Sequence, residues 1–408
     1  MAIDDKVNGK KNLNVPPLRF PEFSGEWEKN NLSKFSSKIT KKNKSNFINN
    51  VLCNSANLGI IPQNDYFDRD IANADNTDSY YIIEQGDFVY NPRKSTAAPY
   101  GPVNIYNGEK PGIISPLYLC FSVFNISPSF LFYRFKSSVW HPYVYSHGDT
   151  GVRYDRVSIK DDVFFDMPIY TPTQNEQEKI ATLLSLIDER ITTQNKIIEK
   201  YESLIQAIIY QKKTDGIRKG NWQKTVLSEV LQERTEKNIN GYTVCSVSVS
   251  QGIINQIEYL GRSFAAKETS HYNVVKYGDI VYTKSPTGDF PYGIVKRNYI
   301  KNTVAVSPLY GVYKPINDNI GVILHFYFMQ SNNAFNYLHP LIQKGAKNTI
   351  NITNARFLEN SIPLPITEDE AVDIANALTS VQTKIDIEKS LLRSYEKEKQ
   401  YLLRQMFI

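Results

Sequence analysis

Residues Ser115–Tyr118 read SPLY, and the same four residues return at Ser307–Tyr310 in a chain of 408 residues. The two copies are 192 positions apart (307 − 115 = 192). Upstream, EQGDFVY at Glu84–Tyr90 corresponds to KYGDIVY at Lys276–Tyr282 with the same offset. Because the matches keep their order and offset, they indicate an internal repeat of roughly 190 residues rather than a chance recurrence.

The repeat extends to both ends of each half. EWEKNNLSKF, starting at Glu26, matches NWQKTVLSEV, starting at Asn221. Downstream, FFDMPIYTPTQNEQEKIATLLSLID from Phe164 corresponds to LENSIPLPITEDEAVDIANALTSVQ from Leu358. The offsets vary only between 192 and 195, the latter set by Trp27 and Trp222, so small insertions separate the halves.

The first part of each repeat is rich in aromatic and β-branched residues. The chain holds 27 tyrosines and 20 phenylalanines, and segments such as GIISPLYLCF and VAVSPLYGVY combine strand-forming residues with Gly and Pro turns. This composition predicts a β-rich α/β domain in each half. The second part follows Pro172 or Pro365 and predicts a long helix, with Thr173 and Thr367 as N-caps before acidic first turns.

Each predicted helix carries an apolar stripe with heptad spacing, which is typical of a coiled coil. The stripes comprise Ile180, Leu184, Ile187, Ile191, Gln194, Ile198 and Tyr201 in the first helix, and Ile374, Leu378, Val381, Ile385, Glu388, Leu392 and Tyr395 in the second. Gln194 and Glu388 interrupt the stripes at equivalent positions. In an antiparallel pair they either face each other as a buried polar layer that fixes register, or reach the edge of the seam and stay solvated.

The predicted fold class is α+β, with two β-rich α/β domains joined by two long antiparallel coiled-coil helices in a pseudo-twofold arrangement. The expected organisation is a flexible N-terminal lead at 1–21, a first domain at 22–171, a first helix at 172–213, a second domain at 214–364 and a second helix at 365–408. A helix of this length would make the pair a rigid rod with a domain at each end.

Composition and motifs argue against catalysis in this chain. There is no GxxxxGK[ST], no GxGxxG, no [ND]PP[YF] and no Pro-Asp to open a PD…(D/E)xK nuclease core. The five histidines and three cysteines show no metal-ligand spacing, so no catalytic or metal-binding residue is expected. The net charge of +5 permits an anionic partner without requiring one. No signal peptide and no apolar run of membrane-spanning length is visible, which favours a cytoplasmic location.

Together, PPLRFPEFSGEW, the paired GDFVY and GDIVY, the paired SPLY and the EQEKIATLLSLID lead resemble the specificity (S) subunit of type I restriction–modification enzymes along essentially the whole chain. The resemblance implies two target-recognition domains that each read half of a split, asymmetric DNA site, with the helices as a ruler between them. It also implies a non-catalytic role and no cofactor in this chain. Two methyltransferase (M) subunits would dock on the helices and carry S-adenosylmethionine, and restriction (R) subunits, joined through M, would use ATP and Mg.

The Glu-Gln pair of EQEKIATLL is absent from the second copy, PITEDEAVDIANAL, so M docking there is expected to use other contacts.

Turn segments that carry cations and small polar residues after predicted strands are the candidates for contacts with double-stranded DNA. In the first domain these are Arg93, Lys94, Ser95, His147, Arg153 and Arg156; in the second they are Lys284, Ser285, Thr287, Lys344, Lys347, Asn348 and Thr349. Their loops differ between the halves, which predicts two different half-sites. The alternative is a duplicated coiled-coil scaffold that binds proteins and has no DNA role, and a steep salt dependence of DNA binding would argue against it.

Overall fold

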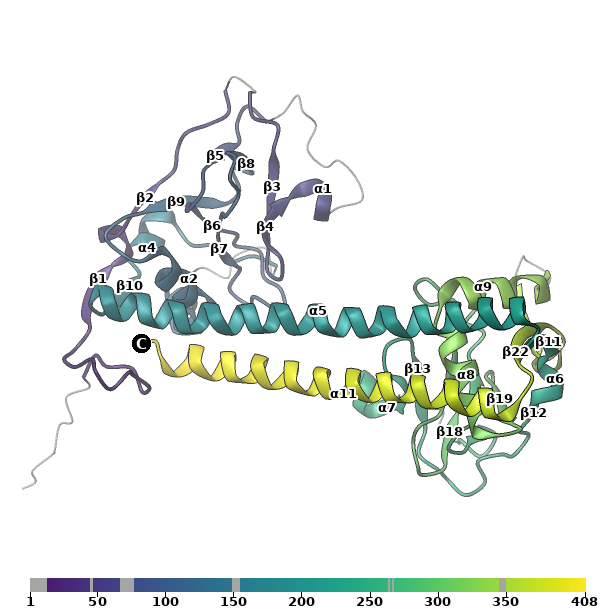
Figure 1. Cartoon of the computed structure of the whole chain (residues 1–408). Helices are drawn as coiled ribbons and strands as arrows, with labels where there is room; N and C mark the ends of the chain where they lie inside the picture. The colour runs from purple at the N-terminus through teal and green to yellow at the C-terminus, as the bar shows by residue number, and fades with distance from the viewer. Residues whose placement is uncertain are drawn as a thin grey trace, which may run out of the picture. The chain divides into compact units, whose positions relative to one another are not determined.

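The computed structural model describes residues 13–44, 47–66, 77–148, 155–262, 265, 268–344 and 350–408. They fall into two compact units (Figure 1). Unit 1 combines Met1–Thr193 with Leu392–Ile408, and unit 2 is Gln194–Leu391. Helices α5 (Gln174–Lys219) and α11 (Glu368–Gln405) each contribute residues to both units.

Unit 1 contains two four-stranded sheets, in the orders β2-β9-β6-β7 and β4-β3-β8-β5, and a separate β1-β10 pair. All its strand pairs are antiparallel except β3 with β8. The strands are β1 (Glu28–Asn31), β2 (Ser36–Lys38), β3 (Val51–Ser55), β4 (Gly59–Pro62), β5 (Tyr81–Ile83), β6 (Phe88–Tyr90), β7 (Val103–Ile105), β8 (Gly112–Ile114), β9 (Leu119–Val123) and β10 (Pro168–Thr171). The short helices are η1 (Leu32–Lys34), α1 (Gln63–Tyr66), α2 (Pro128–Lys136), α3 (His141–His147) and α4 (Asp161–Phe165).

Unit 2 repeats this plan, with one sheet in the order β12-β19-β16-β17 and the pairs β11-β22, β13-β14, β15-β18 and β20-β21. Its strands are β11 (Trp222–Val226), β12 (Leu231–Glu233), β13 (Cys245–Ser248), β14 (Gly252–Asn255), β15 (Asn273–Val275), β16 (Ile280–Tyr282), β17 (Val295–Arg297), β18 (Val304–Val306), β19 (Gly311–Pro315), β20 (Gln343–Lys344), β21 (Ile350–Asn351) and β22 (Ser361–Pro365). Its helices are α6 (Leu227–Val230), α7 (Gln256–Leu260), α8 (Asp318–Phe328), α9 (Ser331–Leu338), η3 (His339–Leu341) and α10 (Asn354–Phe357).

The strands of the β2-β9-β6-β7 sheet in unit 1 correspond one by one to those of the β12-β19-β16-β17 sheet in unit 2. The two sequence repeats therefore fold alike. The predicted fold class, two β-rich domains with two long helices, is confirmed. In both units SPLY forms a tight turn, in which the N–H of Tyr118 or Tyr310 donates to the carbonyl of Ser115 or Ser307 at 3.1 Å.

The two long helices run antiparallel in each unit, because residue numbers rise along α5 while those of their partners on α11 fall. In unit 1 the partners of Asp188 and Arg190 are Lys399 and Tyr395, and in unit 2 those of Gln194 and Tyr201 are Glu388 and Lys384. In unit 1, Asp188 pairs with Lys399. In unit 2, Glu202 pairs with Lys389 at 2.7 Å, and Gln194 Nε2 donates to the Glu388 carboxylate at 2.5 Å. Gln194 is only 5% exposed, so the two polar interruptions form a paired layer rather than a solvated edge.

The remaining residues of the predicted seam lie on the covered faces of α5 and α11. Ile180, Leu184, Ile187, Ile198, Ile374, Leu378 and Ile385 are buried, whereas Ile191, Tyr201, Val381, Leu392 and Tyr395 are half-buried.

The C-terminal end of α11 completes the core of unit 1. Leu402, Leu403, Met406 and Phe407 are buried in the same apolar cluster as Trp27, Phe130 and Phe164. The Phe130 and Phe407 rings lie 5.4 Å apart between centroids. Unit 1 is therefore discontinuous in sequence, and its core requires residues 402–407.

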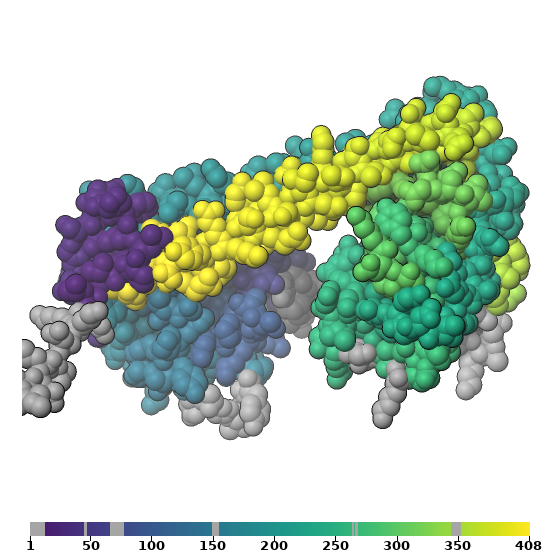
Figure 2. Space-filling view, turned by 90° about the horizontal axis from the view of Figure 1, so that it is seen from below, coloured from purple at the N-terminus to yellow at the C-terminus, as the bar shows by residue number. Residues whose placement is uncertain are grey.

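Residues 13–21 differ from the flexible lead expected at 1–21, while residues 1–12 lie outside the described structure. The N–H of Leu18 donates to the carbonyl of Gln405 at 2.9 Å, which places this segment against the end of α11 (Figure 2). Arg19 forms two hydrogen bonds of 2.7 Å with the carboxylate of Glu176 on α5. Long-range polar contacts of this kind leave no local pattern in the sequence.

Helix α5 ends at Lys219, beyond the expected boundary at 213. Gly216 is tolerated inside it because a Cβ there would lie 1.9 Å from the Trp222 ring, so the glycine provides the space in which that ring packs. The helix stops at Gly220, whose φ of +75° suits glycine. The N–H groups of Gly220 and Asn221 bond the carbonyls of Ile217 and Gly216 in a Schellman motif.

Candidate nucleic-acid interface

The loop between β6 and β7, residues 91–102, carries three of the predicted DNA-contacting residues in unit 1. Tyr90 tethers it: the phenolic O–H donates to the carbonyl of Tyr100 at 2.9 Å, and the ring stacks on Phe164 with centroids 4.7 Å apart. Burial raises the pKa of Tyr90 far above its usual value, so the phenol stays a neutral donor. The last residue of GDFVY therefore closes the loop at its base.

Unit 2 repeats this arrangement around the loop between β16 and β17, residues 283–294. Tyr282 donates to the carbonyl of Tyr292 at 2.8 Å and stacks on Phe357 at 4.7 Å. Each tether spans ten residues and joins a side chain to a backbone carbonyl. The loop sequences can therefore differ while their closure stays the same.

A glycine follows each tether and allows the two strands of the loop to approach closely. Gly101 has φ +84°, and a Cβ there would lie 2.1 Å from the carbonyl oxygen of Asn91. Gly293 has φ +98°, and its Cβ would lie 2.8 Å from the backbone nitrogen of Lys284. Both positions need glycine for its left-handed backbone and for the missing side chain.

Unit 1 brings Arg93, Lys94 and Arg156 together. Arg93 and Arg156 form an isolated antiparallel bridge, and the N–H of Lys94 donates to the carbonyl of Asp155 at 2.8 Å. Arg93 is exposed and lies 3.9 Å from the Asp155 carboxylate, a separation at which an exposed ion pair contributes little. These cations thus present a local basic surface formed by two segments distant in sequence.

Ser95 and His147 are held by their own segments. The Oγ of Ser95 accepts from the N–H of Ala98 at 3.1 Å, so it caps a turn inside the loop. His147 is exposed at the end of α3, where its ring stacks on Tyr143 at 4.1 Å and its Nδ1 lies 2.9 Å from the Tyr143 carbonyl. Both remain accessible, but their known contacts are structural.

Sequence reasoning missed Tyr145, which is 72% exposed on α3. It lines a cleft of about 190 Å³ together with Lys94, Tyr100 and Gly148. An exposed aromatic ring beside basic residues can stack on a base or pack against a sugar. The HPYVYSH segment offered a signal, because Tyr143 and Tyr145 are two positions apart on a short helix and therefore cannot share one face.

In unit 2, Lys284 has a left-handed backbone with φ +61° and is half-buried, and burial lowers the pKa of its ammonium. Ser285 and Thr287 are exposed. Thr287 exchanges two backbone hydrogen bonds of 3.0 Å with Phe290, which makes the tip of this loop a small hairpin. The tip therefore offers hydroxyl groups rather than a cluster of cations.

Four of the predicted residues lie outside the described residues: Arg153, Lys347, Asn348 and Thr349. Lys344 belongs to β20, which pairs with β21 through Lys344 and Ile350.

Two further equivalences between the units were not recognised from the sequence. Glu176 and Glu370 both accept a hydrogen bond from an indole N–H, of Trp27 at 3.3 Å and of Trp222 at 3.0 Å. The second copy thus keeps the glutamate of the Glu-Gln pair, while Ala371 replaces Gln177. The hairpins β3-β4 and β13-β14 also correspond, and the shared GII at Gly59 and Gly252 was the available signal.

The chain is similar to known proteins in both sequence and fold. Residues 226–396 match the family model described as type I restriction modification DNA specificity domain. The type I restriction-modification S subunit from M. genitalium has a similar fold, with a TM-score of 0.56 and 12% identity over 97% of this chain and 99% of that chain. This likeness shows the fold, and with the family match it confirms the resemblance to S subunits.

Two further solved structures are similar over nearly their whole length. One, described as showing complex assembly and conformational transition of the type I R-M system, has a TM-score of 0.49 and 14% identity, covering 96% of this chain and 99% of that chain. The HsdS subunit from Thermoanaerobacter tengcongensis has a TM-score of 0.39 and 14% identity, covering 96% and 98%. Among the described residues, no helix combines the length and apolar character needed to cross a membrane.

Proposed function

With residues 226–396 matching the type I restriction–modification DNA specificity domain as the premise, we propose that the chain is the DNA-specificity subunit of a type I restriction–modification complex. Each unit reads one half of a bipartite, asymmetric DNA site. The observation that carries this proposal is the pair of tethered loops, 91–102 and 283–294, which share one closure and differ in sequence.

The chemistry of the loops supports two distinct readers. Loop 91–102 and Arg156 offer guanidinium groups, which pair bidentately with guanine or with phosphate. Loop 283–294 offers hydroxyl groups and one half-buried lysine. Because the donors differ, the two units would select different bases, and the whole site would not be palindromic.

The helices α5 and α11 are proposed to dock two M subunits and to set the spacer between the half-sites. The chain itself would carry no cofactor. S-adenosylmethionine would enter on M, while ATP and Mg would act on the R subunits, which would join through M. This chain selects the site, and its partners methylate or cut it.

The test is a methylome measured after co-expression with the cognate M subunit in a host without adenine methylation. We expect a split, asymmetric methylated motif. Arg93→Ala together with Arg156→Ala should relax or abolish the half-site read by unit 1 and leave the other half unchanged. Lys41→Ala, which removes an exposed lysine 3.9 Å from Glu84, is the matched control and should leave both halves intact. A palindromic, uninterrupted motif would refute the two-reader proposal.

DNA binding by the same complex distinguishes this function from a protein scaffold. Phosphate contacts release counterions, so affinity should fall steeply with salt, and removing one contacting arginine should lower the slope of log K against log[salt] by about 1. Binding that is insensitive to salt would favour the scaffold.

A further inference from the structure

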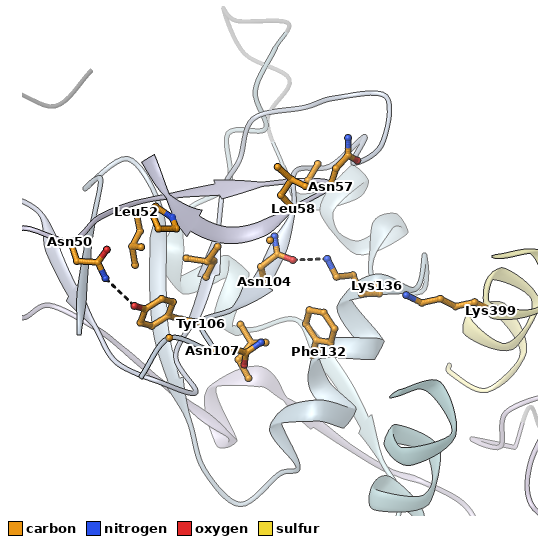
Figure 3. A pocket seen from close by; sticks show the side chains of 16 residues that line it. Asn50, Leu52, Asn57, Leu58, Asn104, Tyr106, Asn107, Phe132, Lys136 and Lys399 are labelled. Atoms are coloured by element: carbon orange, nitrogen blue, oxygen red, sulfur yellow. Dashed lines mark hydrogen bonds between the residues drawn. The ribbon is translucent and has the colours of Figure 1, made fainter. Parts of the chain in front are cut away.

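A cavity of about 740 Å³ opens in unit 1 between the β3-β4 hairpin, the loop after β7 and helix α2 (Figure 3). Its volume is within the range of small-molecule sites in proteins. Among the described residues that line it, the charged ones are Lys136 and Lys399, and no carboxylate is present. The proposed DNA-reading loop does not contribute to this lining.

The ammonium of Lys136 is the feature that calls for a ligand. Its Nζ donates to Asn104 Oδ1 at 2.5 Å and lies 4.9 Å from the centroid of the Phe132 ring. It forms no ion pair with any described carboxylate, whereas Lys399 is neutralised by Asp188. An ammonium can donate three hydrogen bonds, so two of its N–H groups have no acceptor in the described chain.

The neighbouring amides fix this geometry. Asn104 Nδ2 donates to Asn54 Oδ1 at 2.5 Å and to the carbonyl of Ser55 at 2.9 Å. Asn54 Nδ2 in turn donates to the carbonyl of Val89 at 2.8 Å. Because the amide hydrogens of Asn104 are used in this way, its oxygen must face Lys136. The cation is therefore positioned by a network of buried hydrogen bonds.

Other parts of the cavity lining have a different character. Asn57 and Asn107 line it on two sides of Asn104 (Figure 3), both are exposed, and their side-chain amides make no hydrogen bond within the described chain. Leu58, at the tip of the hairpin, is 61% exposed beside Asn57. Free amides next to an apolar surface can bind the edge and face of a heterocyclic base.

We propose that this cavity binds a phosphate-bearing ligand of nucleotide size, with the phosphate on Lys136 and the base at Asn57 and Asn107. The ligand is either a free nucleotide or a nucleotide within DNA, since both present the same phosphate chemistry. The site is separate from the loops assigned to sequence reading, and its test does not depend on the proposed function.

The test is isothermal titration of the full-length chain with AMP and with inorganic phosphate. Lys136→Met should weaken both ligands at least tenfold, whereas Lys110→Met, which removes an exposed lysine outside the cavity lining, should change neither. Asn57→Ala should weaken AMP and leave inorganic phosphate unchanged, because it removes a contact to the base alone. No binding of AMP or phosphate by the wild type at about 10 mM, or an unchanged affinity in Lys136→Met, would overturn the proposal.

The pH dependence of the wild type tests the site without a mutation. Burial, followed by the nearby charge of Lys399, lowers the pKa of Lys136 to about 8. The charged fraction therefore falls from about nine-tenths at pH 7 to about one-tenth at pH 9, and the affinity for AMP should fall about tenfold. A constant affinity across this range would contradict a role for Lys136.

A competition experiment identifies the source of the phosphate. If a duplex of about 30 base pairs displaces AMP, the cavity receives a nucleotide of DNA. If saturating duplex leaves AMP binding unchanged, the cavity serves a free nucleotide.

Discussion

Replacing Arg19 with methionine removes the cation that faces Glu176 and keeps most of the apolar part of the side chain. The Glu176 side chain is fully buried, and that of Arg19 is 13% exposed. Without Arg19, the carboxylate keeps a hydrogen bond of 3.3 Å from the Trp27 indole and loses two of 2.7 Å. Leaving one partner of a buried ion pair without the other costs about 3–5 kcal/mol.

The same figure predicts a shift in the melting temperature of unit 1. This unit contains 193 + 17 = 210 residues, and for domains of this size 1 kcal/mol corresponds to about 2–4 °C. Arg19→Met should therefore lower the melting temperature of unit 1 by about 10 °C. Unit 2 should be unaffected, because neither partner belongs to it.

Tryptophan fluorescence can report on unit 1 alone. Trp27 and Trp140 lie in unit 1 and Trp222 in unit 2, so a Trp222→Phe background removes the signal of unit 2. Lys34→Met is the matched control within unit 1: Lys34 is 53% exposed where it pairs with Glu28 at 3.0 Å, so its loss should change stability by less than about 1 kcal/mol.

The reverse and double variants complete the cycle. Glu176→Met should cost less than Arg19→Met, because Arg19 retains hydrogen bonds to the carbonyls of Gly25 at 2.5 Å and Ser24 at 3.2 Å. The double variant should recover much of the stability, since an apolar pair leaves no buried charge. A loss below about 1 kcal/mol in Arg19→Met, or a double variant less stable than either single one, would refute this reasoning.

Three other predictions concern unit 2, the unit 1 loop and the helices. Burial lowers the pKa of His325 to about 3, so the folded state binds this proton more weakly than the unfolded state does. The free energy of unfolding of unit 2 should therefore fall as the pH drops below about 6.5. In urea titrations, His325→Gln should make this loss of stability at acid pH smaller. Gly101→Ala places a Cβ 2.1 Å from the Asn91 carbonyl oxygen and should disturb loop 91–102. The affinity for DNA, measured in a salt titration, should fall at least tenfold. The melting temperature of unit 2 should stay constant. Deleting residues 194–200 together with 385–391 removes one heptad, about 10 Å, from each long helix. The spacer between the two half-sites of the methylated motif should then shorten by about three base pairs. An unchanged spacer would contradict the proposal that the helices set its length.

The internal repeat could be predicted because several identical side chains make the same contacts in both units. Tyr90 and Tyr282 are identical, and both close a loop through a backbone carbonyl. In SPLY, the serine Oγ accepts from the N–H of Leu117 or Leu309 at 3.3 Å, which explains the shared serine. The leucines are 64% and 72% exposed, and nothing within the chain explains why they are identical.

Contacts between residues distant in sequence could not be predicted in the same way. The alignment of Phe164 with Leu358 puts Glu176 opposite Glu370, but it could not show that each glutamate accepts a hydrogen bond from the corresponding indole. Arg19 and Glu176 are 157 positions apart, and a single sequence carries no sign that they meet.

The candidate loops could be located from the sequence, but the roles of their side chains could not. Turn composition correctly indicated loops after β6 and β16. It could not show that Ser95 caps a turn, that Lys284 is half-buried, or that Arg93 and Arg156 lie side by side. Those details depend on how segments distant in sequence pack together.

The discontinuity of unit 1 has a consequence for synthesis on the ribosome. Its core needs Leu402, Leu403, Met406 and Phe407, yet 199 positions separate Thr193 from Leu392. At about 5–20 residues per second, the ribosome needs about 10–40 s to bridge that interval. A chain released early would leave the apolar cluster around Trp27 and Phe130 uncovered. Unit 1 therefore cannot complete its core until residues 392–408 have been synthesised, and a chain cut short before them would expose an apolar surface of the kind that chaperones bind.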